Sequence, residues 1–289
     1  MIIPKIVVKS WQIAEEEELF LRFLKHPEFP THRQLILNIF PELAKELENA
    51  PDEKIAVRAF LIKFDRTHRK AITHIVHNNR SIVAKQSKKA LRALGNAMEH
   101  KWLKPITYSV IPTILPFSPY GTNHFNFSII GYILNKKQHD VLMVAVHEIS
   151  HFIFFNLLKN IEQERKIELP KQVKHFLKEA LTAAIFNEEP LKHILKIKEH
   201  KGNPEIQGLY VKWASPKPIL LTDVIRGYYR RARKNKTPFT RLLAKLAVAG
   251  YKNQNAFIKK RALWDRYGQR ILTEPRVRKQ YSAPIIIKK

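Results

Sequence analysis

Apolar residues recur at helical spacing over most of this chain, and runs rich in β-branched or aromatic residues are short. The periodicity predicts helices from residue 12 onward, over residues 31–47 and over residues 52–95, with Pro30, Pro41 and Pro51 as boundaries. Strands are predicted over residues 2–8, 106–111 and 125–133. The pattern therefore indicates an α+β protein in which helices dominate.

The longest apolar region follows the last of these strands. Between Val141 and Leu158 the only ionisable residues are His147, Glu148 and His151, and the region predicts one helix from about residue 138 to about residue 159. A solvated helix face does not place such residues among valine, leucine, isoleucine and phenylalanine. A buried helix whose histidines bond to backbone carbonyls would leave the carboxylate of Glu148 in need of a partner.

The spacing of these three residues suits a metal ion. Side chains four positions apart lie one above the other on a helix, so His147 and His151 can share a cation. Zinc accepts neutral imidazole nitrogen, and a catalytic zinc site has three protein ligands and one position for water. Glu148 lies about 100° round the helix from His147, where its carboxylate can take a proton from that water.

A third ligand has to come from another part of the chain. A helix predicted after Pro170 has an apolar stripe that leaves Glu179 at the edge of the buried face, where a carboxylate can reach a neighbouring helix. His175, four residues earlier, lies on the same side and is an alternative ligand or a group near the reacting centre. The further alternatives are Glu162, Glu164, Glu168 or no third ligand.

Composition narrows the class of protein. The chain has 289 residues, 45% of them hydrophobic, which indicates a globular protein, and it has no cysteine, which excludes disulfides and thiolate metal sites. Pro4 and two lysines interrupt the apolar N-terminal run, so we expect no signal peptide. Ionisable residues at the centre of the apolar helix argue against a membrane span. We therefore expect a cytoplasmic protein.

The formal net charge of +27 will attract polyanions. Between Asp223 and Asp265 there is no acidic residue, and the basic residues of this segment alternate with aromatic ones. Such a segment can form a nucleic-acid surface, and it can equally form solvated helix faces over a core.

These residues together resemble the zincin metallopeptidases of the gluzincin kind. The resemblance covers roughly residues 105–190 and rests on His147-Glu148-Ile-Ser-His151 and on Leu-Lys-Glu179-Ala-Leu-Thr. It implies a small twisted sheet against the metal helix, His147, His151 and Glu179 as zinc ligands, and Glu148 as catalytic base. It also implies that the strand at residues 125–133 pairs with an extended substrate.

The sequence departs from related patterns at two positions. Phe154 stands where the metzincin motif needs glycine, which excludes that branch, and Ala183 cannot act as the acidic partner found four residues after the glutamate in thermolysin-like enzymes. The donor that stabilises the oxyanion is not marked by a motif; Tyr210 and His175 are the candidates.

We expect three segments: a helical N-terminal region (residues 1–104), a zincin-like core (residues 105–190) and a basic helical region that completes the cleft (residues 191–289). The predicted function is zinc-dependent hydrolysis of peptide bonds. One alternative is a nucleic-acid-associated protein whose zincin core cuts bound protein or is inactive. Another is a non-catalytic interaction protein in which the motif occurs by chance.

Overall fold

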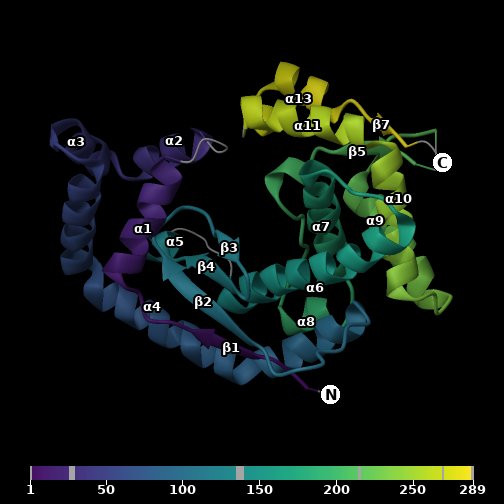
Figure 1. Cartoon of the computed structure of the whole chain (residues 1–289), viewed down its shortest axis with the longest axis horizontal. Helices are drawn as coiled ribbons and strands as arrows, with labels where there is room; N and C mark the ends of the chain where they lie inside the picture. The colour runs from purple at the N-terminus through teal and green to yellow at the C-terminus, as the bar shows by residue number, and fades with distance from the viewer. Residues whose placement is uncertain (1, 26–29, 135–139, 214–215, 269, 288–289) are drawn as a thin grey trace. The chain divides into compact units, whose positions relative to one another are not determined.

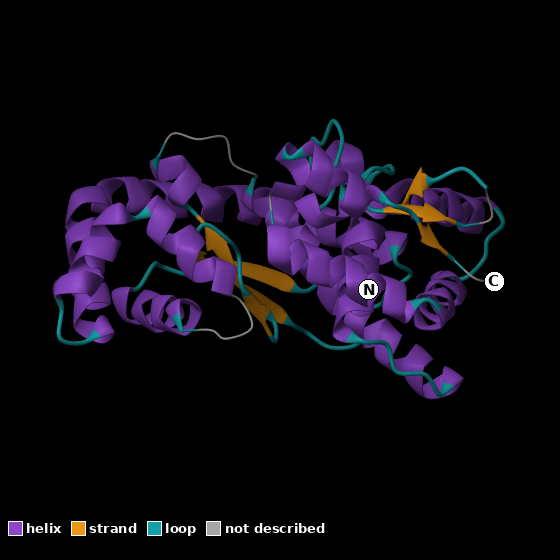
Figure 2. Ribbon diagram, turned by 90° about the horizontal axis from the view of Figure 1, so that it is seen from above, coloured by secondary structure: helices purple, strands orange, loops and turns teal. Residues whose placement is uncertain are grey.

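The computed structural model describes residues 2–25, 30–134, 140–213, 216–268 and 270–287 (Figure 1). Helices make up most of the chain, and the strands form two small sheets (Figure 2). The predicted α+β class with dominant helices is confirmed. The helices are α1 Ile13–Leu24, α2 Pro30–Ile39, α3 Pro41–Asn49, α4 Glu53–Ala97, α5 Ile130–Ile133, α6 Val141–Arg165, α7 Lys171–Phe186, α8 Leu191–Ile194, η1 Pro204–Ile206 (a 3₁₀ turn), α9 Leu221–Lys234, α10 Phe239–Lys252, α11 Gln254–Tyr267, α12 Arg270–Thr273 and α13 Pro275–Ser282. The strands are β1 Lys5–Val8, β2 Thr107–Thr113, β3 Tyr120–Gly121, β4 His124–Ser128, β5 Tyr210–Lys212, β6 Ile219–Leu220 and β7 Ile285–Ile286.

The chain divides into two compact units, the first made of residues 1–88 and 102–148 and the second of residues 89–101 and 149–289. The division passes through helix α6. The predicted division into residues 1–104, 105–190 and 191–289 stays a prediction.

The first unit holds a four-stranded sheet in the order β1-β2-β4-β3. Its first three strands are parallel, and β3 is antiparallel to β4. Helix α4 runs alongside β1 and β2 (Figure 1), and Arg80 of α4 donates from Nε to the carbonyl of Val8 over 3.0 Å. The rings of Phe20, Phe40 and Phe60, from α1, the α2–α3 junction and α4, pack 5.2–6.1 Å apart between centroids. This aromatic cluster holds the N-terminal helices together.

A buried carboxyl group ties α1 to the sheet. Oε1 of Glu16 accepts hydrogen bonds from Oγ1 of Thr113 at 2.8 Å and from the backbone N–H of Ile114 at 2.9 Å, at the end of β2. Burial raises the pKa of Glu16 to about 7, because the charged form loses its hydration. The group is therefore partly neutral near physiological pH.

The strand predicted over residues 125–133 is shorter than expected. The last β2–β4 pair joins Thr113 to Ser128, and Ile129 takes up a helical backbone conformation before α5. A strand needs a partner for its backbone groups, and β2 provides none beyond Thr113. The apolar run therefore continues as one helical turn.

The long apolar helix is confirmed as α6. Its predicted start near residue 138 lies outside the described residues, and the helix continues past Lys159 to Arg165. By length and composition α6 is able to cross a membrane, and 67% of its most apolar window is buried within the protein. Core helices have the same properties, so the absence of a membrane span stays a prediction.

The second unit is built around α7. Helices α9, α10 and α11 pack against it, and every residue from Phe176 to Phe186 is buried. Close packing with α10 is possible because Gly250 has no side chain: a Cβ atom there would lie 2.7 Å from Cγ1 of Val173. A three-stranded sheet in the order β6-β5-β7 completes this unit.

Candidate metal centre

Helix α6 carries the three residues of the motif on adjoining positions of its surface. His147, Glu148 and His151 each offer one ligand atom, and these atoms all lie within 4.8 Å of one another. Glu148 and His151 are buried, and His147 is partly exposed. The helical spacing predicted from the sequence therefore places two imidazoles and a carboxylate around one point.

Glu179 of helix α7 lies beside His151. Nε2 of His151 lies 3.6 Å from Oε1 of Glu179, and both side chains are only 1% exposed. Two ligand atoms of a tetrahedral zinc ion, each about 2.0–2.2 Å from the metal, are separated by roughly 3.3–3.6 Å. The pair is therefore spaced as two ligands of one metal ion.

The approach of the two helices has a local cause. Oγ of Ser150 and Oγ1 of Thr182 are hydrogen bonded at 2.7 Å, and both residues are buried. Ser150 precedes His151, and Thr182 lies one helical turn after Glu179. Two small hydroxyl side chains thus hold α6 and α7 close where His151 lies beside Glu179.

The other acidic candidates for third ligand lie elsewhere. Glu162 accepts a hydrogen bond from the backbone N–H of Leu169 at 2.7 Å and pairs with Nζ of Lys174 at 3.0 Å. Glu164 and Glu168 are exposed to solvent. Of the candidate carboxylates, Glu179 is the one that the structure places beside His151.

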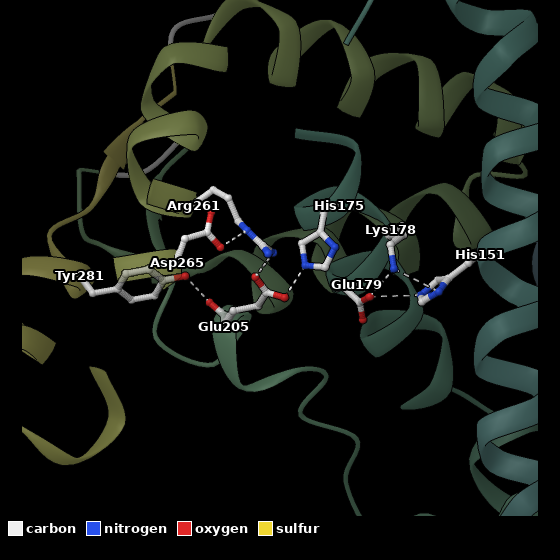
Figure 3. A network of polar contacts seen from close by, with 8 residues as sticks. All are labelled: His151, His175, Lys178, Glu179, Glu205, Arg261, Asp265 and Tyr281. Atoms are coloured by element: carbon white, nitrogen blue, oxygen red, sulfur yellow. Dashed lines mark hydrogen bonds and ion pairs between the residues drawn. The ribbon is translucent and has the colours of Figure 1, made fainter. Parts of the chain in front are cut away.

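Glu179 is more deeply buried than its predicted place at the edge of an apolar stripe, because neighbouring helices cover α7 on several sides. The same burial encloses Lys178, which was not among the residues predicted from the sequence. Its Nζ lies 3.2 Å from Nδ1 of His151 and donates a hydrogen bond to Oε1 of Glu179 (Figure 3). One signal was available: a lysine directly before the candidate ligand in the Leu-Lys-Glu-Ala-Leu run of α7.

His175 belongs to a different polar network. Its Nε2 bonds to Oε1 of Glu205, whose Oε2 accepts a hydrogen bond from Arg261 over 2.8 Å (Figure 3). Arg261 also pairs with Asp265 at 2.8 Å, and the hydroxyl of Tyr281 donates to the backbone carbonyl of Glu205. These contacts link α7, η1, α11 and α13, and the proposed role of His175 as an oxyanion donor or third ligand stays a prediction.

Tyr210, the other candidate oxyanion donor, lies in β5, where its backbone pairs with Leu220. Among the residues that the structure describes, its side chain makes no hydrogen bond to His151 or Glu179.

The expected pairing of a substrate with β4 meets an obstacle. The outer edge of β4 is already bonded: Tyr120 and Gly121 pair with Phe125 and His124, and the N–H of Asn126 donates to the carbonyl of Pro119 at 2.7 Å. A peptide would have to displace this segment to add a strand there.

The side chains gathered here are two imidazoles, two carboxylates and an ammonium. Imidazole and carboxylate ligands are those of catalytic zinc sites, and the chain offers no thiolate. No protein-family model matches this chain. Comparisons with characterised proteins and with solved structures found no match either.

Proposed function

We propose that this protein is a zinc-dependent peptidase of the zincin type. His147, His151 and Glu179 are the metal ligands, and Glu148 is the general base. The observation that carries the proposal is the 3.6 Å separation of His151 Nε2 and Glu179 Oε1, which joins the motif helix to a carboxylate on a second helix. This separation supports the proposal because it is the spacing of two ligands on one zinc ion.

The position of each residue gives its proposed role in the reaction. Zinc held by His147, His151 and Glu179 would act as a Lewis acid: it would polarise the peptide carbonyl and lower the pKa of a bound water to about 7. Glu148, adjacent to the ligand His147 on α6, takes the proton of the attacking water on its carboxylate. It then delivers this proton to the amine nitrogen as the peptide bond breaks.

Glu148→Gln tests this assignment. The amide keeps the shape of the side chain but cannot accept the proton, so we expect zinc content to be unchanged and cleavage of a peptide library to fall at least about 100-fold. Zinc in the purified protein is measured by elemental analysis. Cleavage by the variant at the wild-type rate would contradict the role of Glu148. Absence of zinc from reconstituted wild-type protein would contradict the peptidase proposal and favour the interaction protein.

A second candidate function, polyanion binding, rests on the charge of the second unit. Basic side chains of α9, α10 and the turn between them are exposed, among them Lys234, Lys236, Arg241 and Lys245. However, Tyr229, Phe239 and Phe257 are buried in the core and are not free to stack on bases. Tyr251 of the same segment is exposed, and Tyr228 and Trp264 are partly exposed, so this surface offers both charge for a phosphate backbone and rings for stacking on bases.

The salt dependence of DNA affinity tests whether the protein binds polyanions through this surface. We expect the logarithm of the affinity for duplex DNA to fall linearly with the logarithm of salt concentration. Replacement of Lys234, Lys236, Arg241 and Lys245 by glutamine should flatten the slope by up to about 0.9 for each phosphate that the variant no longer binds. Replacement of the exposed Lys63, Lys70, Lys85 and Lys88 of α4 is the control of equal charge. Equal slopes for the two variants would show that the charge acts without a defined surface.

A further inference from the structure

Lys178 is a buried cation in contact with two proposed metal ligands. Its side chain is 4% exposed, and that of Glu179 is 1% exposed. Nζ donates to Oε1 of Glu179, the same oxygen that lies 3.6 Å from Nε2 of His151 (Figure 3). The ammonium group therefore binds an oxygen that a metal ion shared with His151 would use.

The contact with His151 also bears on metal binding. An ammonium group has three donors and no acceptor, so Nδ1 of His151, 3.2 Å away, accepts the hydrogen bond and the proton of the neutral ring is on Nε2. Nε2 is the nitrogen nearest to Glu179. A histidine ligand needs a free electron pair at the nitrogen that faces the metal. Lys178 thus favours the tautomer that does not bind a metal through Nε2.

The charge of Lys178 also weakens metal binding. Two cations that share one carboxylate repel each other, and this repulsion is strong where water is excluded. In the chain without metal, however, Lys178 stabilises the fold. It neutralises Glu179, whose burial without a counter-charge would be costly.

We propose that Lys178 is an internal cation that competes with zinc for Glu179 and holds His151 in the non-binding tautomer. Zinc binds when these contacts break, and Lys178 sets the affinity of the site. The inference rests on the metal site of the proposed function and adds a control on its occupancy.

Zinc affinity of Lys178→Met, measured by competition with a chromogenic chelator, tests the inference. Methionine keeps much of the side-chain length and removes the ammonium group. A charge-assisted hydrogen bond and a repulsive charge are removed together, so we expect zinc to bind about 10-fold to 100-fold more tightly than in wild type. We also expect the metal-free variant to melt at a lower temperature and to gain more stability from zinc.

Lys174→Met is the matched control. Lys174 lies one turn earlier on α7 and pairs with Glu162, so this variant lacks the same kind of ion pair at a distance from His151. Its zinc affinity should equal that of wild type. If Lys178→Met folds only with zinc, its refolding midpoint against free zinc gives the affinity, and Lys178→Gln provides a second measurement.

The outcomes separate the two proposals. Equal or weaker zinc binding by Lys178→Met, with zinc still bound by wild type, overturns the role of Lys178 and leaves the peptidase proposal intact. Zinc binding by neither protein overturns both. Zinc binding by Lys178→Met alone would support Lys178 as a competing cation and would contradict the peptidase proposal for the wild-type protein.

Discussion

Nε2 of His151 and Oε1 of Glu179 lie 3.6 Å apart, although the two residues belong to different helices. Ser150, one residue before His151, and Thr182, three residues after Glu179, are hydrogen bonded and link the two helices beside this pair. Larger side chains at these two positions would separate α6 and α7 and move His151 away from Glu179. The pairing of His151 with Glu179 is therefore a property of a helix–helix contact and not of the motif alone.

Glu179→Gln should abolish zinc binding. The amide oxygen is a poor zinc ligand, so we expect zinc content to fall from about one ion per wild-type chain to nearly none. Glu162→Gln is the control, because Glu162 is bound to Lys174 and to the backbone of Leu169. Elemental analysis of folded protein gives the answer. Zinc retained by Glu179→Gln and lost by Glu162→Gln would reassign the third ligand.

Two glycines of the second unit should respond to alanine with opposite signs. In Gly250→Ala the new methyl group would meet Cγ1 of Val173, a stiff β-branched residue, at 2.7 Å, and Cδ1 of Leu177 at 3.2 Å. We expect a loss of about 1–3 kcal/mol in the free energy of unfolding.

In Gly227→Ala the nearest atom is 4.0 Å away, at the end of Arg231. A gain of about 0.5–1 kcal/mol is expected there from helix propensity. Urea unfolding measures both, and equal changes would show that α10 does not pack as described.

His175→Leu separates a structural from a catalytic role, because leucine has no group that can bond to Glu205. The histidine binds Glu205 in the network that reaches Arg261, and the loss of a partner from a buried carboxylate should lower the free energy of unfolding by about 1–3 kcal/mol. We expect kcat and KM for a cleaved peptide to change less than about threefold, because His175 bonds to Glu205 and not to Glu179. A large fall in kcat at unchanged stability would restore His175 as a candidate oxyanion donor.

Much of the fold follows from local signals. Pro30 and Pro41 mark where α2 and α3 begin, and the apolar run around the motif predicts α6. Helical spacing is a local property, and it alone brings the ligand atoms of His147, Glu148 and His151 close together. Glu179 could be proposed as a ligand because it stands in a helix after Pro170.

The remainder depends on contacts between distant segments. Periodicity predicted one buried face for α7, whereas α9, α10 and α11 cover the helix on several sides. The burial of Lys178 follows from that coverage; the sequence shows a lysine directly before Glu179 but not that this lysine is buried. Glu205 comes from a short 3₁₀ turn with no periodic signal, so its pairing with His175 was equally invisible. The end of β4 was set by the length of its partner β2.

The pKa of Glu16 gives the first unit a stability that depends on pH. Folding raises this pKa from 4.5 to about 7, so between these values the folded chain holds a proton that the unfolded chain has released. The stabilising contribution is complete below about pH 4.5 and is lost as pH rises through 7, by about 3 kcal/mol in total.

Glu16→Gln should remove this dependence. The amide oxygen can still accept the bonds from Thr113 and Ile114, and there is no charge to bury. We expect the variant to lose less stability than wild type between pH 5 and pH 8, as measured by urea unfolding at each pH. Glu15→Gln, at an exposed position of the same helix, should behave as wild type. An equal decline in Glu16→Gln and wild type would show that another group titrates in this range.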